Sequence, residues 1–252
     1  MHRTDHASLS VTEHALASLA AVYEQAGIGL DDLDSYSTVG WFQTLAANCL
    51  QPSEEAVALA ADGVVLPLRI GPLRLGPLRG RRARGLSNFY SCRFSPPGLE
   101  HSSEALRAVA AFGRHLRNRG LASLWFDALD DGPKTTMVQG LQAAGWLVEP
   151  FPQFGNWYLP AEGLDFERYW RQRPGALRNT GRRGYRSLIE KGDGAIVCHV
   201  EPGAAEAAIR AYEAVYAQSW QAAEPFPDYM PNLIRHGLAT GEAQVWCLLA
   251  GG

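Results

Sequence analysis

The sequence has little lysine, no long apolar run and no signal-peptide pattern. Only Lys134 and Lys191 are lysine among 23 basic residues, a bias that GC-rich genomes also produce, so it excludes no function. No apolar stretch reaches the roughly 20 residues that a membrane-spanning helix needs. The first ten residues, MHRTDHASLS, lack the apolar core of a signal peptide. We therefore expect a cytoplasmic protein without a membrane span.

Recognisable catalytic and metal-binding motifs are also lacking. The sequence contains no GxSxG, HExxH or Walker pattern, and no pair of carboxylates that can be located by spacing. Its cysteines are far apart and outside metal-ligand spacing, so we expect free thiols, mostly buried, and no metal. These are Cys49, Cys92, Cys198 and Cys247. No catalytic residue can be named.

Positive charge is instead concentrated in one segment. Residues 168–191 contain eight basic residues and one acid, whereas the rest of the chain has 15 basic and 25 acidic residues. Such a concentration is typical of a surface that faces an anion. The alternative is a solvated helix pair that connects two halves of the chain. The candidate substrate contacts are Arg182, Arg183, Arg186 and the neighbouring Tyr185.

The first half predicts a layered arrangement of helices and strands. Ser10–Glu13 reads as a capping box that opens a helix ending at Gly27, followed by an acidic loop to residue 36. Asp62-Gly63 between two apolar runs predicts a two-residue hairpin turn. Pro67 then places part of the second strand at an edge or bulge. Further helices are expected at 103–119 and 133–145, and strands at 121–127, 146–149 and 154–159.

An arginine-rich stretch follows the hairpin. We expect residues 69–84 to form a solvated loop, and residues 85–94 to form a strand. Asn88 and Tyr90 would then lie on one face of that strand, because alternate side chains point together, and Arg93 is a third candidate contact on the same strand. This polar face suits a ligand cleft, or equally an edge strand that faces water.

The second half repeats part of the first. Strands are expected at 195–201 and 244–250, and helices at 203–219 and 228–238. Residues 229–252 align with 41–63 as helix, polar link, strand and turn, which suggests a tandem repeat whose second copy is incomplete. Trp220 and Tyr229 flank a loop rich in proline and acid and are further candidate substrate contacts. The expected domains are 1–36, 37–162, a basic connecting segment 163–193, and 194–252.

Several stretches carry a resemblance to a known family. They are Trp41-Phe42, Leu66-Pro67-Leu68, Asn88-Phe-Tyr90, and Leu177–Leu188 (LRNTGRRGYRSL) followed by Gly192. The order of elements around them resembles the bacterial tandem GNAT-like acyltransferases, of the BioF2-like or CelD (BcsL)-type group, which are related to the FemAB aminoacyltransferases. The resemblance implies an α/β fold with a GNAT-like mixed sheet flanked by helices, with the second copy truncated.

The resemblance implies an N-acyltransferase that moves an acyl group from acyl-CoA to a small-molecule amine acceptor, with a link to cell-envelope or polysaccharide metabolism. A FemAB-like enzyme would use aminoacyl-tRNA instead. A third alternative is a non-catalytic module that binds an anion or RNA through the basic segment.

One part of the family pattern is missing. The resembled enzymes hold the CoA pyrophosphate on backbone N–H groups of a glycine-rich loop that opens a helix. The corresponding stretch of the first half, 95–102, reads SPPGLEHS, and its prolines lack the required N–H groups. In the second half the corresponding position lies beyond Gly252. No CoA loop is assigned.

Overall fold

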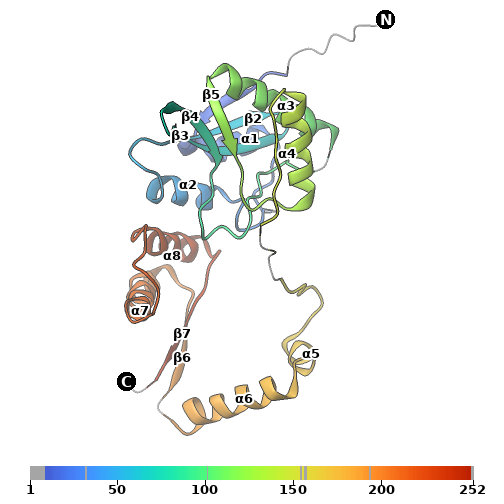
Figure 1. Ribbon diagram of the computed structural model, residues 1–252. Coiled ribbons are helices and arrows are strands. Elements are labelled where there is room, and N and C mark those ends of the chain that lie inside the picture. The colour runs from blue at the N-terminus through green and yellow to red at the C-terminus, as the bar shows by residue number, and fades with distance from the viewer. Residues whose placement is uncertain are drawn as a thin grey trace, which may run out of the picture. The chain divides into compact units, whose positions relative to one another are not determined.

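The computed structural model describes residues 9–31, 33–100, 102–153, 155, 158–192 and 194–250. The chain divides into two compact units, Met1–Gln153 and Phe154–Gly252 (Figure 1). None of the helices in the described residues combines the length and the apolar character that crossing a membrane requires.

A mixed sheet of five strands forms the centre of the first unit. The strand order is β1-β2-β3-β4-β5, with antiparallel pairing from β1 to β4 and parallel pairing of β4 with β5. Helices flank this sheet, with α3 and α4 along one side and α2 along the other (Figure 1), which confirms the predicted α/β class. The strands are β1 (Thr12–Ala15), β2 (Glu55–Ala61), β3 (Val64–Leu75), β4 (Leu78–Gly85) and β5 (Leu121–Trp125).

Four α-helices belong to the described part of the first unit, and side chains cap two of them, α2 and α3. They are α1 (Leu19–Gln25), α2 (Val39–Asn48), α3 (Ser103–Asn118) and α4 (Asp131–Ala143). The Thr38 side chain accepts a hydrogen bond from the Trp41 N–H, and that of Ser102 from the Ala105 N–H, so each satisfies a donor that the first turn leaves free. Phe42 of α2 and Phe112 of α3 are fully buried, so each helix packs an aromatic side chain into the interior of the unit.

The predicted hairpin is confirmed. Asp62 and Gly63 join β2 to β3 with φ angles of 50° and 76°, as a two-residue turn of this type requires. β3 is a central strand, yet Pro67 lies one residue beyond the end of its ladder with β4, which begins at Leu68. The missing N–H of Pro67 therefore costs no ladder bond on the β4 side.

Several local predictions for the first unit are wrong. Thr12–Ala15 is the edge strand β1, paired with β2, because pairing with an existing strand outweighs the capping-box pattern. The arginines of residues 69–84 lie on β3 and β4 rather than in a loop. Residues 146–149 form no strand. The strand expected at 154–159 falls partly outside the described residues, because 154, 156 and 157 are not among them.

The second unit contains four helices and two strands among its described residues. The predicted elements around 195–250 are present, with bounds that differ by at most two residues at each end. They are α5 (Phe166–Arg171), α6 (Gly175–Tyr185) with a following π-helical turn (Arg186–Glu190), β6 (Ala195–His199), α7 (Ala205–Ala217), α8 (Tyr229–Thr240) and β7 (Val245–Leu249).

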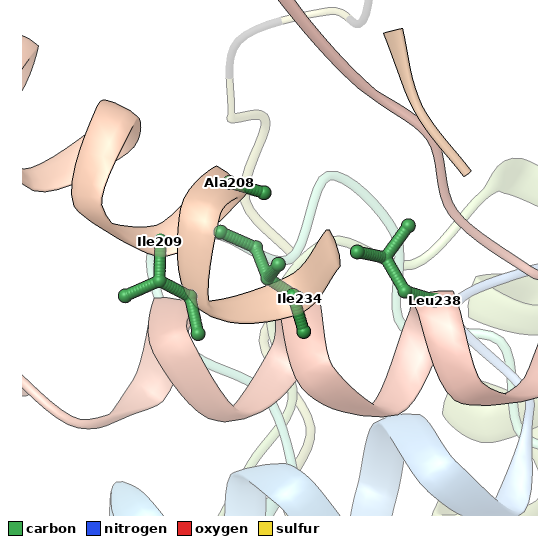
Figure 2. Close-up of a cluster of buried hydrophobic side chains, with 5 residues drawn as sticks. Ala208, Ile209, Ile234 and Leu238 are labelled. Carbon is green, nitrogen blue, oxygen red and sulfur yellow. The ribbon is translucent and has the colours of Figure 1, made fainter. Parts of the chain in front are cut away.

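A small apolar cluster joins α7 to α8. Ala208 and Ile209 of α7 pack with Ile234 and Leu238 of α8 (Figure 2), and all four are at least 93% buried. Gly241 ends α8 in the left-handed conformation with φ 75°, as is common after a helix.

β6 and β7 pair in antiparallel fashion as a two-stranded sheet. One face carries Val245, which packs against the α7–α8 cluster. The register places Ile196 opposite Leu248 and Cys198 opposite Trp246, so these four share the other face. Ile196, Trp246 and Leu248 are 54%, 65% and 58% exposed, so that face is apolar and open.

Candidate functional site

The basic segment folds into two short helices whose side chains are largely exposed. Arg182, Arg183 and Arg186 line a shallow hollow on one side of α6, together with Ala176, Asn179 and Thr180. Tyr185 is 52% exposed. The structure therefore brings three of the predicted arginines together on one helix face, as the i, i+4 spacing of Arg182 and Arg186 requires.

The contacts of these arginines with the protein are weak. The Nη2 of Arg183 donates to Thr180 Oγ1 at 3.5 Å, and the Nε of Arg186 lies 3.5 Å from Glu190 Oε2. Exposed pairs at such distances contribute little to stability. The guanidinium groups therefore remain available to an anion from solution.

Aromatic contacts hold α5 against α6. A Cβ at Gly181 would lie 3.0 Å from a ring carbon of Trp170, so glycine at this position permits the close approach. Phe166 stacks on Trp170 with ring centroids 5.8 Å apart, and the Arg173 guanidinium lies 4.5 Å from the Tyr169 ring centroid. The approach of Trp170 to Gly181 is thus the contact that joins α5 to α6, while the other two stabilise α5 and the residues that follow it.

Asn88, Tyr90 and Arg93 do not share a strand face, and the prediction of a strand at 85–94 is wrong beyond Gly85. Asn88 Oδ1 accepts from the Tyr90 N–H at 3.0 Å, and the Asn88 N–H donates to Ser91 Oγ at 3.1 Å. These bonds from side chain to backbone make a turn that competes with strand pairing.

Arg93 connects two separate segments of the first unit. Its Nη2 lies 2.6 Å from Asp130 Oδ2 and its Nη1 lies 3.2 Å from Asp34 Oδ2. The positive charge of Arg93 is thus matched by two carboxylates at the start of α4 and in the loop before α2. This arrangement is a structural tie within the unit.

The two aromatic candidates of the second unit lie in opposite environments. Trp220 is 93% exposed, whereas Tyr229 is fully buried at the start of α8. The loop between them is held by Tyr212, whose hydroxyl donates to Glu224 Oε1 at 2.7 Å, and by Tyr216, whose hydroxyl donates to the Ala222 carbonyl at 2.8 Å. Burial raises the pKa of both Tyr212 and Glu224.

The N-terminus of α3 does not fit a coenzyme A pyrophosphate. The Ser102 side chain already caps it, and Glu104 lies in its first turn, where a carboxylate takes the place of an anionic ligand. Pro97 is engaged in the sheet, since its carbonyl accepts from the Val65 N–H at 3.1 Å. The stretch at 95–102 therefore serves the packing of the first unit.

Sequence reasoning missed a polar row on the sheet. Arg69 of β3, Arg84 of β4 and Trp125 of β5 are successive register partners, and Asp127 lies 3.5 Å from Arg84. The alternation of arginines along β4 at 82 and 84 was the available signal. Groups of His, Cys, Asp and Glu that could hold a metal ion do not occur among the described residues.

Comparison with known proteins gives one similarity, in the second part of the chain. Residues 175–252 match a family model described as an acetyltransferase (GNAT) domain. No curated protein matches, and no solved structure matches. The matched stretch begins at the first residue of α6 and takes in β6, α7, α8 and β7, so it includes Arg182, Arg183 and Arg186. The match supports a GNAT-type acetyltransferase domain at residues 175–252, and with it a general N-acyltransferase function.

Proposed function

We propose that this chain is an N-acyltransferase that moves an acyl group from an acyl-CoA thioester to the amine of a small molecule. The observation that carries the proposal is the acetyltransferase family match over residues 175–252. In the proposed reaction the amine nitrogen bonds to the thioester carbonyl carbon, the carbon–sulfur bond breaks, and the CoA sulfur leaves while the amine loses a proton. A link to cell-envelope or polysaccharide metabolism remains a prediction.

We propose that Arg182, Arg183 and Arg186 contact an anionic part of the substrates. Their side chains are exposed, line one hollow along α6 and the start of the π-helical turn after it, and lie inside the matched stretch. Guanidinium groups suit phosphate because their donors match its oxygens in pairs. Tyr185, Trp220 and Tyr229 are further proposed contacts within the same stretch. Asn88, Tyr90 and Arg93 lie outside it, and their bonds hold the first unit together.

The proposed domain organisation is a tandem of two GNAT-like copies, with the first at 37–162 and the second from 194. Its support is that a helix and the next strand follow in the same order in both units, α2 and β2 in the first and α8 and β7 in the second. The proposed connecting segment, 163–193, contains α5 and α6.

The test is direct binding of acetyl-CoA to the full chain by calorimetry, followed by chromatographic detection of CoA release with a panel of amines. Thiol reagents are unsuitable for this assay, because Cys92 is exposed and is not part of a disulfide. The double variant Arg182→Ala, Arg183→Ala should weaken acetyl-CoA binding about tenfold or more, as expected for loss of bonds to charged donors. The control is Arg168→Ala, Arg171→Ala on α5, which lies before the matched stretch.

Absence of saturable acetyl-CoA binding would contradict the acyl-CoA proposal. Two alternatives then remain. The largely exposed basic side chains of α5 and α6 are compatible with each of them. A FemAB-like transferase would bind aminoacyl-tRNA and transfer its aminoacyl group to an amine. A non-catalytic RNA-binding module would bind RNA without turnover, with an affinity that falls steeply with salt and is lost in the Arg182→Ala, Arg183→Ala variant.

A further inference from the structure

Two arginines lie side by side on the sheet of the first unit, outside the stretch that matches the family model. Arg69 of β3 is the register partner of Arg84 of β4, which is in turn the partner of Trp125 of β5. Register partners project to the same face, with Cβ atoms about 5 Å apart, and like charges directly opposite one another are destabilising. The pair therefore needs an anion close by.

The nearest carboxylate is only partly available to the pair. Asp127 Oδ2 lies 3.5 Å from Arg84 Nη2, which is longer than a charge-assisted hydrogen bond of about 2.8 Å. The other oxygen of Asp127 accepts a hydrogen bond from the Trp125 indole N–H at 2.6 Å. Asp127 thus forms one long ion pair, with Arg84. Arg69 has no direct ion pair among the described residues.

Glu54 lies close enough for its charge to act on Arg69, where it opposes the lowering of the Arg69 pKa, but no ion pair joins the two side chains among the described residues. Its side chain packs over Gly71, where an added Cβ would lie 2.7 Å from the Glu54 Cγ. Its Oε2 accepts from the Gln51 N–H at 3.1 Å. Cys49 cannot supply the negative charge either, because burial raises the pKa of its thiol to about 11, so the thiol is neutral at physiological pH.

Both guanidinium groups have donors that remain unused. The Nε atoms of Arg69 and Arg84 are buried and have no hydrogen-bond partner among the described residues. Burial, followed by the charge of Arg84, lowers the pKa of Arg69. A buried donor without an acceptor is costly, and two adjacent ones are an arrangement that an added acceptor would relieve.

The other face of the same sheet shows how this fold treats arginines that serve structure alone. Arg81 Nη2 lies 2.6 Å from Glu55 Oε1, and Arg119 lies 2.8 Å from Glu13 and 2.9 Å from Glu55. Each of these arginines has a carboxylate at short range. The pair formed by Arg69 and Arg84 differs because its single carboxylate partner among the described residues, Asp127, lies at the longer distance of 3.5 Å from Arg84, and both Nε donors lack an acceptor.

We infer that Arg69 and Arg84 bind a small oxyanion, either a carboxylate or a phosphate group, with Trp125 as the aromatic wall of the site. The Nε and Nη donors of a guanidinium lie in one plane and match two oxygens of such a group. The side chain of Arg84 is 28% exposed and Trp125 is 40% exposed, so the site is open to solvent. It is independent of the proposed acyl transfer.

The test is a titration of the ¹⁵N-labelled full chain with sodium phosphate, and separately with sodium acetate, at constant ionic strength. The Nε–H signals of Arg69 and Arg84 and the indole signal of Trp125 should shift saturably. A response to phosphate alone identifies a phosphoryl group as the ligand, and a response to both anions identifies a carboxylate-type site. Shifts no larger than those caused by sodium chloride would overturn the inference.

Arg69→Met is the informative variant. It removes one of two adjacent buried charges and keeps an apolar side chain of similar length, so the fold is expected to tolerate it. Phosphate affinity, read from the Trp125 signal, should fall about tenfold or more with the loss of a charged donor. Arg69→Lys keeps the charge but not the planar guanidinium group, so its phosphate affinity should lie between those of the wild type and Arg69→Met. Arg81→Met on the other face should leave the affinity unchanged, and equal affinity in Arg69→Met and the wild type would overturn the inference.

Discussion

The two units contain a similar run of elements in very different environments. In the first, α2 is followed by β2, in which Val57, Ala58 and Leu59 are at least 92% buried. In the second, α8 is followed by β7, in which Trp246, Leu248 and Leu249 are at least half exposed. β2 has a strand on each side, whereas among the described residues β7 pairs only with β6. An apolar strand is thus buried only where neighbouring strands and a covering layer of the protein pack against it.

The largest expected effect tests this difference directly. Leu59→Ala in β2 should lower the free energy of unfolding of the first unit by about 3 to 5 kcal/mol, because it leaves a cavity in a closed core. Leu248→Ala in β7, where the side chain is 58% exposed, should change stability by less than about 0.5 kcal/mol. Urea denaturation of both variants measures the two values. Equal losses would show that β7 is as well covered in solution as β2.

A second substitution asks whether the α7–α8 cluster carries the stability of the second unit. Ile234→Ala should lower that stability by about 2 to 3 kcal/mol, since Ile234 is 7% exposed in a cluster of few residues. Hydrogen exchange should show faster exchange in α7 and α8 and no change in β2 and β3. Faster exchange throughout the chain would instead mean that the two units unfold together.

The hairpin turn that gives β2 its second partner offers a smaller effect. Gly63→Ala should cost about 1 kcal/mol, because Gly63 has a φ of 76° that other residues adopt with strain. Gly132→Ala is the matched control. Gly132 lies in α4 without a positive φ and with open space at its Cβ, so alanine should be neutral or stabilising by up to about 1 kcal/mol. Thermal unfolding of both variants separates strain from the loss of glycine itself.

Cysteine chemistry gives the finest comparison of the units. Burial raises the pKa of Cys49 from 9.0 to about 11, whereas Cys92 is exposed and Cys198 and Cys247 on β6 and β7 are partly exposed. Because the thiolate is the reactive form, alkylation at pH 8 should proceed in the order Cys92, then Cys198 and Cys247, then Cys49. Mass spectrometry of partly alkylated protein reads this order directly.

The raised pKa of Cys49 also predicts that the protein loses stability at alkaline pH. Between about pH 9 and 11 the unfolded chain releases the Cys49 proton while the folded chain retains it. The unfolded state then binds fewer protons, so stability falls as pH rises through this window. Cys49→Ala should flatten this part of the pH dependence of urea unfolding, and an unchanged slope would assign it to other groups.

Local signals in the sequence predicted the elements that local chemistry decides. Asp62-Gly63 specified a hairpin through its backbone preferences, and the helical spacing of α3 and α7 was sufficient for both helices. Predictions failed where distant partners decide the outcome. Ser10–Glu13 resembles a helix cap, but Thr12–Ala15 pairs with β2, some 45 residues away. Asn88 ends the strand pattern because its side chain makes a turn.

The candidate site was predictable only in part, for the same reason. The spacing of Arg182, Arg183 and Arg186 on one helix indicated a shared face, which the hollow on α6 shows. The row of Arg69, Arg84 and Trp125 depends on the register of three strands. Register follows from the packing of the whole sheet, so no short stretch of sequence contains it.

The departure of the chain from the sheet after β4 has a consequence for aggregation. β3 continues past the end of β4, and an uncovered stretch of strand is a template for pairing with another molecule. Here the N–H of Val65 donates to the Pro97 carbonyl, and the N–H of Leu86 donates to the Pro67 carbonyl. The loop that returns after β4 therefore covers this edge of β3. Pro67 and Pro97 have no backbone N–H, so they offer no donor to a strand of another molecule.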